Sequence, residues 1–197
     1  MREIISDSVR EWSSRAGLPA VNVFEGVRDI PFAVIPEQYS LEKGPTSMLE
    51  EKRGFCIPKH YLLGMIYEKM GLKVRYPVYH FKWHDFHLPH GLKERAFALP
   101  VTFHLACKIF VDGKWVLVDA TWDARLLKAG FPVNLGWDGA SETINAVKPL
   151  AEHPCDTALA AETLIREKVA SYSLPEKLAL ARFSADLNKW LAEVRVR

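Results

Sequence analysis

Two β-rich runs joined by Asp112-Gly113 constrain the fold of this chain more than any other feature. They read FHLACKIFV over residues 103–111 and KWVLVDATW over residues 114–122. Asp-Gly between such runs is a strong signal for a hairpin with a two-residue turn. That turn pairs Val111 with Lys114 and fixes every other pair. One face of the hairpin is then apolar except at its tip and is expected to lie on the core; it carries Phe103, Leu105, Cys107, Ile109, Val111, Lys114, Val116, Val118, Ala120 and Trp122.

The opposite face of the hairpin brings a histidine and an aspartate together. In this register Asp119 is directly opposite Ala106 and is a diagonal neighbour of His104. Diagonal residues lie roughly 7–8 Å apart at the backbone, within reach of long side chains, and Ala106 is too small to separate them. The register therefore predicts a His104–Asp119 pair on the face turned away from the core.

A cysteine stands at the start of a predicted helix. From Cys56 to Gly71 the apolar residues recur at helical spacing, Pro58 suits a first turn, and Gly71 suits the position just past the end. The free N–H groups and dipole of a helix N-terminus stabilise a thiolate. Lys59 and His60, in the same first turn, are expected near the cleft at most.

Together these residues fit the chemistry of acyl transfer. Each alone favours a plainer interpretation, such as a surface histidine or an aspartate at a strand end. In combination, a cysteine nucleophile, a histidine base and an aspartate that orients the histidine form a catalytic triad.

These residues resemble the transglutaminase-like superfamily of papain-like cysteine enzymes. The resemblance covers roughly residues 22 to 125, from VFEGVRDIPF through Gly54-Phe55-Cys56 and His104 to WVLVDATW at 115–122. It implies an α+β fold in which an antiparallel sheet packs against the helix that carries the nucleophile, followed by C-terminal helices. It also implies Cys56 as nucleophile, His104 as base and Asp119 as orienter. The aromatic residue that usually follows the histidine is replaced by Leu105-Ala106, a departure on the substrate side of the site.

The implied function is that of a cysteine-dependent amide hydrolase or acyltransferase of the protease, amidase or transglutaminase kind. Its substrate would be a peptide, an amide or a small acyl compound, with hydrolysis and transamidation both open. Two alternatives remain. One is a catalytically idle binding module of the same fold. The other is an enzyme similar to arylamine N-acetyltransferases, whose Arg-Gly-Gly-x-Cys signature is partly present in RGFC at 53–56.

Four further residues are candidates for binding substrate. A tetrahedral intermediate needs hydrogen-bond donors beside the N–H of Cys56. Gln38 and Tyr39 are candidates, since Glu50 stands where papain-like enzymes often carry a glutamine. Asn134 and Trp137 lie in the loop FPVNLGWDGAS, which follows closely after Asp119, and binding residues concentrate on loops.

The histidine-rich stretch His80–His90 is the one tract that raises the question of a metal. The spacing H-x3-H-x2-H-x2-H could hold zinc, but the tract ends in Pro89 and Gly91 and contains no cysteine. We expect a solvated or cleft-lining loop over residues 84–93 and no metal. No nucleotide, haem or flavin motif is present, so no cofactor is expected.

The chain is expected to form a single domain over residues 1–197. Its core spans about 22–125 and includes a strand over residues 74–81; a loop follows over 126–155, and helices close the chain over 156–197. Ser173 and Glu176 have capping-box spacing at the start of the second of these helices.

Charge and cysteine content exclude several classes of function. A net charge of +2 does not indicate a basic surface that would bind nucleic acid or an anionic membrane. Three cysteines are too few and odd in number for a disulfide framework.

The segment MREIISDSVREWSSRAG lacks the apolar stretch of a signal peptide, and a cytoplasmic location is expected. The oligomeric state is left open.

Overall fold

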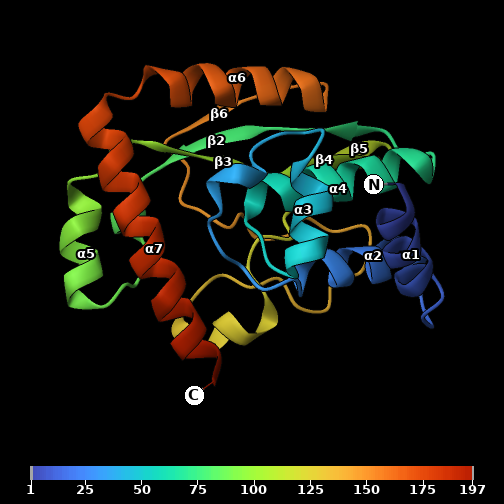
Figure 1. Ribbon diagram of the computed structural model, residues 1–197. Coiled ribbons are helices and arrows are strands. Elements are labelled where there is room, and N and C mark those ends of the chain that lie inside the picture. The colour runs from blue at the N-terminus through green and yellow to red at the C-terminus, as the bar shows by residue number, and fades with distance from the viewer. Residues whose placement is uncertain (1, 197) are drawn as a thin grey trace.

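The computed structural model describes residues 2–196 and has an α+β fold (Figure 1). The helices are α1 (Arg2–Ser13), α2 (Pro19–Arg28), α3 (Gly44–Glu51), α4 (Cys56–Lys69), α5 (His90–Phe97), α6 (Ala158–Ser171) and α7 (Leu174–Val196), with short 3₁₀ turns η1 (Pro36–Gln38), η2 (Trp83–Asp85) and η3 (Ala124–Ala129). The strands are β1 (Val74–Arg75), β2 (Val78–Phe81), β3 (Thr102–Leu105), β4 (Cys107–Val111), β5 (Lys114–Val118) and β6 (Ala151–His153).

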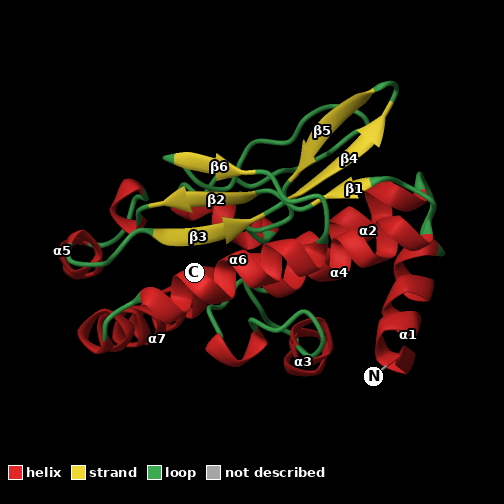
Figure 2. Ribbon diagram, turned by 90° about the horizontal axis from the view of Figure 1, so that it is seen from above, coloured by secondary structure: helices red, strands yellow, loops and turns green. Residues whose placement is uncertain are grey.

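The strands form two three-stranded antiparallel sheets, ordered β1-β4-β5 and β3-β2-β6. Figure 2 shows the strands gathered toward one side of the molecule and most of the helices toward the other. Helix α4 contacts β1, β3 and β4, so both sheets meet the helix that begins at Cys56. The expected arrangement of an antiparallel sheet against this helix, with helices closing the chain, is confirmed.

The register of the Asp112-Gly113 hairpin is confirmed. Val111 pairs with Lys114 and Cys107 with Val118, and both turn residues have positive φ, 49° for Asp112 and 79° for Gly113. Two positive φ values define the type I′ turn whose twist matches that of paired strands.

Each of the two longer strands expected from the sequence is divided between the sheets. The run over residues 74–81 breaks at Tyr76-Pro77, because Pro77 has no N–H for a ladder and the N–H of Tyr76 donates to the carbonyl of Cys155 at 2.8 Å. The run over residues 103–111 breaks at Ala106, whose N–H donates to the carbonyl of Pro77 at 3.1 Å. These two breaks let β2 and β3 leave the hairpin sheet and carry His104 toward the helices.

The hairpin face opposite the core is not open to solvent along its whole length, which corrects the expectation above. Near the turn it carries exposed side chains such as Phe110, but His104 and Asp119 are each 1% exposed. The loop after β5 covers them: the N–H of Thr143 donates to the carbonyl of Leu117, and the N–H of Ala146 donates to Asp119. Backbone donors of a segment distant in sequence therefore bury the pair.

Two elements lie where the sequence predicted loops. Helix α5 begins at His90, directly after Pro89, and buries Leu92 and Ala96. Leu92 and Ala96 are four residues apart and share one helical face, although Pro89 and Gly91 suggested a loop. Strand β6 lies within the expected loop 126–155 and pairs with β2, which places Ala151 opposite His80.

The C-terminal helices follow the sequence pattern. The expected capping box is present at α7: the backbone N–H of Ser173 donates to the carboxylate of Glu176 at 2.7 Å, and the N–H of Glu176 donates to Ser173 Oγ at 3.4 Å. Figure 1 shows α7 running diagonally across the front of the fold. Its buried residues are Phe183, Leu187, Leu191 and Val194.

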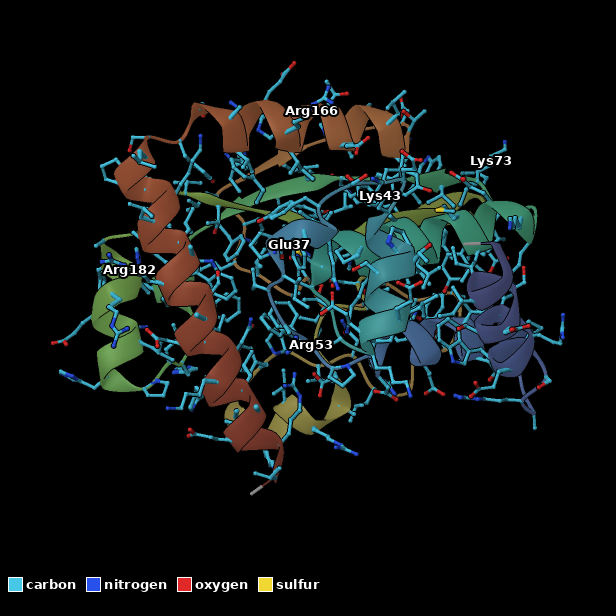
Figure 3. The ribbon with its side chains drawn as sticks, in the orientation of Figure 1. Glu37, Lys43, Arg53, Lys73, Arg166 and Arg182 are labelled. Carbon is cyan, nitrogen blue, oxygen red and sulfur yellow. The ribbon has the colours of Figure 1, made fainter. Side chains whose placement is uncertain are left out.

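The exterior carries charged side chains of both signs, of which Glu37, Lys43, Arg53, Lys73, Arg166 and Arg182 are labelled in Figure 3. Within residues 2–196, no helix combines the length and apolar character needed to cross a bilayer.

Candidate active site

The candidate nucleophile, Cys56, is the first residue of α4 and follows a tightly packed approach segment. Gly54 forms a parallel bridge with Phe32: its N–H donates to the carbonyl of Pro31 and its carbonyl accepts from Ala33. A Cβ at Gly54 would lie 2.5 Å from Met48 Cγ and 2.9 Å from Gln38 Oε1, so the segment before Cys56 requires glycine. The thiol is thereby held at the N-terminus of α4, where free N–H groups favour negative charge.

His104 and Asp119, the pair predicted by the hairpin register, are hydrogen-bonded. His104 Nε2 lies 2.7 Å from Asp119 Oδ2. Cys56 and His104 line the same cavity, and Nδ1 is the ring nitrogen that Asp119 leaves free. Burial by itself lowers the pKa of His104, but the charge and hydrogen bond of Asp119, together with Cys56, outweigh it and raise the pKa to about 10. The imidazole is therefore held in its charged form at neutral pH.

Asp119 is a buried carboxylate whose two oxygens accept four hydrogen bonds. Oδ2 accepts from His104 and from the N–H of Ala146, while Oδ1 accepts from the N–H and the hydroxyl of Thr121 at 3.1 and 2.6 Å. Burial would raise the pKa of Asp119, but His104 and these hydrogen bonds reverse the effect and hold it well below its usual value. Asp119 is thus fixed both in position and in charge.

A second histidine, His60, joins α4 to the backbone just after Asp119. It is fully buried; Nδ1 lies 2.8 Å from the carbonyl of Cys56, and Nε2 accepts from the N–H of Ala120 at 3.0 Å. Because Nε2 accepts, the proton of the neutral ring is on Nδ1 and is donated to Cys56. Burial lowers the pKa of His60 to about 4, although Asp119 Oδ1, 3.6 Å away, acts in the opposite direction.

His60 predicts a loss of stability in mild acid. An unfolded histidine titrates near pH 6.5, whereas His60 in the folded chain titrates at about pH 4. Between these values the unfolded state binds a proton that the folded state excludes, so stability falls as the pH falls from 6.5 toward 4, by on the order of 3 kcal/mol. Urea unfolding of the wild type and of His60→Gln at several pH values measures this. The variant should lose much of the slope in this window, and equal slopes would contradict the burial of a neutral His60.

The buried side chain of Lys59 also stabilises the backbone that follows Asp119. Its side chain is fully buried, and its Nζ donates to the carbonyls of Arg28 and Thr121, each at 2.8 Å, and to that of Ala120 at 3.4 Å. Burial lowers the pKa of Lys59 to about 7, against the opposing charges of Asp123 and Asp29. Three carbonyl acceptors match the three N–H groups of an ammonium ion. Lys59 thus ties the backbone just after Asp119 to α2 and does not line the cleft.

Cys56 and His104 open into a cavity of about 250 Å³. Its walls come from the segment before α3, from β2 and β3, from the segment that follows β5, and from α6 and α7. The lining is mostly aromatic and aliphatic, and Tyr39 is one of the residues in it. Burial and the nearby charge of Cys56 raise the pKa of Tyr39 well above its usual value. A carbonyl compound in this cavity would meet the thiol, the imidazole and Tyr39.

The other three candidate binding residues do not line this cavity. Gln38 is buried, and its Nε2 donates to the carbonyl of Arg53 at 3.1 Å, so it supports the segment before Cys56. Asn134 Nδ2 donates to the carbonyls of Asp119 and Ile144 and holds the covering loop to β5. Trp137 packs against Phe24 and donates to the carbonyl of Ser141. In this structure the side chains of all three make their hydrogen bonds within the protein.

The other two cysteines differ from Cys56 in their surroundings. Cys107 has no exposed surface, its thiol donates to the carbonyl of His60, and burial raises its pKa well above the usual value. Burial and Asp156 raise the pKa of Cys155. Neither lines the cavity.

Alkylation should therefore begin at Cys56. At neutral pH, iodoacetamide should label Cys56 at least about tenfold faster than Cys107 or Cys155, because thiolate character and access set the rate. Peptide mapping of a time course measures the three rates. Labelling of Cys107 before Cys56 would contradict both the buried face of the hairpin and the nucleophile assignment.

Three histidines of the stretch His80–His90 each contact a different neighbour. His80 packs against His153, His84 stacks on Phe97, and His90 lies 3.5 Å from Glu94. Over the described range 2–196, no three His, Cys, Asp or Glu side chains gather in a way that could hold a metal ion.

Searches for similar proteins return distant likenesses. No protein-family model and no curated protein matches the chain. Among solved structures, one called "Putative Cysteine Protease from Cytophaga hutchinsonii" is similar over 81% of this chain and 44% of its own, with 13% identity and a TM-score of 0.46. A second, described as a TGase, is similar over 62% of this chain and 32% of its own, with 11% identity and a TM-score of 0.44.

The chain spans less than half the length of either structure. Because both TM-scores lie below 0.5, the roles assigned to residues below rest on the geometry of this chain.

Sequence reasoning missed Thr121 and Thr143, and it did not foresee the buried contacts of Lys59 and His60. Thr121 and Thr143 bind Asp119 through its carboxylate and its N–H, and Lys59 and His60 are buried beneath it. A signal existed for His60, which follows Cys56 by four residues and so shares its helical face. Thr121 follows Asp119 by two residues, a spacing at which aspartate often bonds the local backbone. No comparable signal marks Thr143.

Proposed function

We propose that this protein is a cysteine-dependent acyl-transfer enzyme that works through a thioester on Cys56. The observation that supports it most is the arrangement of three side chains: Cys56, at a helix N-terminus, shares a cavity with His104, and His104 Nε2 lies 2.7 Å from Asp119 Oδ2. This set opens into a cavity with room for a substrate.

In the acylation step, the thiolate sulfur of Cys56 attacks the carbonyl carbon of an ester, thioester or amide. A carbon–sulfur bond forms and the carbonyl electron pair moves to oxygen. The imidazolium of His104 then donates its Nδ1 proton to the leaving group as the carbon–heteroatom bond breaks. Asp119 holds the imidazole in place and stabilises its positive charge throughout.

The negative oxygen of the intermediate needs donors in fixed positions. The backbone N–H of Cys56, at the first position of α4, is one proposed donor. The hydroxyl of Tyr39 is the second: Tyr39 lines the same cavity, and the charge of Cys56 contributes to its raised pKa. Gln38, the other candidate, already donates to Arg53 and Glu51.

In the deacylation step, His104 accepts a proton from water or an amine as that nucleophile attacks the thioester. The carbon–sulfur bond breaks and the thiolate of Cys56 is restored. Water gives a carboxylic acid and completes a hydrolysis, whereas an amine gives a new amide and completes a transfer. The chemistry of the site supports both outcomes, and the supply of acceptor decides between them.

An aryl acetate ester tests the proposal and separates the two outcomes. We expect a burst of phenol equal to the enzyme concentration, followed by slower turnover, if the thioester accumulates. Added alkylamine should divert product from acetate to the acetamide, as mass spectrometry of the products will show. Pretreatment with iodoacetamide that labels Cys56 should abolish both. Full turnover by enzyme alkylated at Cys56 would reject the proposal.

A further inference from the structure

The cavity beside Cys56 is lined mainly by large apolar side chains. Six phenylalanine and tryptophan side chains supply much of its wall, namely Phe32, Phe55, Phe81, Trp83, Phe103 and Trp122. An apolar cavity of roughly 150 Å³ is large enough to hold benzene. The cavity of about 250 Å³ therefore has room for a group larger than a single aromatic ring.

Several polar groups in the wall already have partners within the protein. The hydroxyl of Thr121 donates to Asp119 at 2.6 Å, that of Thr102 donates to the carbonyl of Phe81 at 3.3 Å, and that of Tyr172 donates to the carbonyl of Val101 at 2.6 Å. A polar substituent placed deep in the cavity would lose its water and gain few new hydrogen bonds. An apolar substituent has no hydrogen bonds to water that it would lose on entering the cavity.

One face of α7 forms part of the wall. Lys177, Leu180, Ala181 and Ser184 line the cavity and recur at i, i+3, i+4 and i+7. The side chains at these positions lie on one side of a helix. The exposed Arg182, labelled in Figure 3, belongs to the same helix but not to the wall.

Helix α7 is held to the rest of the fold by three sets of bonds. The side chain of Asn188 bonds both the N–H and the carbonyl of Val34, at 2.8 and 2.9 Å. Arg195 pairs with Asp123 at 2.6 Å and donates to the carbonyl of Phe32 at 2.8 Å. Arg95 of α5 pairs with Asp186. This wall is therefore a fixed part of the fold.

We infer that this cavity binds an apolar acyl group, so that the substrates are esters, thioesters or amides of hydrophobic carboxylic acids, with α7 limiting the size of that group. This inference rests on the proposed function. The acyl group stays on Cys56 through both half-reactions, whereas the leaving group must depart before water or an amine attacks. A walled apolar cavity next to the thiol suits the part of the substrate that remains.

A series of p-nitrophenyl esters with one leaving group tests the inference. The acyl groups are acetyl, butanoyl, hexanoyl and 3-phenylpropanoyl. Burial of each additional methylene should raise kcat/KM roughly three- to fourfold until the cavity is filled, beyond the trend of uncatalysed hydrolysis. An equivalent series of acetate esters with apolar extensions on the phenol should show little gain.

Variants on α7 show whether the gain arises in this cavity. Ala181 lines the cavity yet is exposed, so Ala181→Phe should fold and fill part of the opening. It should lower the ratio of 3-phenylpropanoyl to acetyl turnover at least about fivefold, the equivalent of one to two methylenes. Ala192→Phe is the matched control: an exposed alanine on the same helix outside the cavity, for which the ratio should not change. Ser184→Leu, a second change in the wall, should act in the same direction as Ala181→Phe.

The outcomes separate this inference from the proposed function. Turnover of acetyl ester that depends on Cys56, with no gain along the acyl series, would overturn the inference and leave the proposed function standing. A gain along the phenol series instead would also overturn it, because the cavity would then hold the leaving group. Absence of turnover that depends on Cys56, with every ester, would overturn both.

Discussion

The Cys56→Ala variant should lose turnover by a factor on the order of 10⁴ or more while keeping its fold. Removal of a triad nucleophile leaves only what binding and oxyanion stabilisation supply, so the loss is large. The stability cost should be small, about 1 kcal/mol, because the deleted sulfur borders an existing cavity. Ester turnover and urea unfolding of the same preparation measure the two effects.

Cys107→Ala is the matched control for this experiment. Cys107 is fully buried and does not line the cavity, so its loss should lower stability while turnover per folded molecule persists. Turnover retained by Cys56→Ala, or lost equally in both variants, would contradict the assignment of Cys56.

The Asp119→Asn variant should lose both activity and stability. We expect turnover to fall by a factor on the order of 10–10³, less than the roughly 10⁴ of serine triads, because a thiolate forms more easily than an alkoxide. An amide nitrogen cannot accept hydrogen bonds, so it would oppose either the two donors of Thr121 or those of His104 and Ala146. Donors left unpaired in this buried place should cost about 2–4 kcal/mol.

Asp138→Asn provides the same chemical change on the surface. Asp138 accepts hydrogen bonds from the N–H groups of Ala140 and Ser141 and from the Ser141 hydroxyl, but it is exposed and outside the cavity. Its replacement should leave turnover unchanged and cost less stability, since water can satisfy the donors. Turnover near the wild-type level in Asp119→Asn would remove Asp119 from the site. An intact melting temperature would contradict its four buried hydrogen bonds.

What the sequence predicted well was determined by local chemistry. The Asp112-Gly113 turn fixes the register of β4 and β5, and Gly71, with φ of +84°, ends the helix that begins at Cys56. Ser173 and Glu176 form the predicted cap of α7. Each of these features depends on residues close together in sequence, where turn and capping preferences are strong.

What the sequence did not predict depends on contacts between distant segments. On the hairpin alone, Asp119 lies on a face turned away from the core, and only the later segment with Thr143 and Ala146 buries it. For the same reason the burial of Lys59 could not be foreseen, because its three carbonyl partners belong to α2 and to the segment that follows β5. The wall formed by α7 is a third case, since its residues follow Cys56 by more than 120 positions.

Mass spectrometry of a trapped acyl-enzyme tests the central claim most directly. The protein is mixed with p-nitrophenyl 3-phenylpropanoate, quenched in acid within the burst, and digested with trypsin, which releases Cys56 in the peptide Gly54–Lys59. We predict one 3-phenylpropanoyl group per chain on this peptide, removable by hydroxylamine as a thioester is. An adduct on Cys107, Cys155 or a lysine, or burst turnover with Cys56 unmodified, would contradict the claim that Cys56 carries the acyl group.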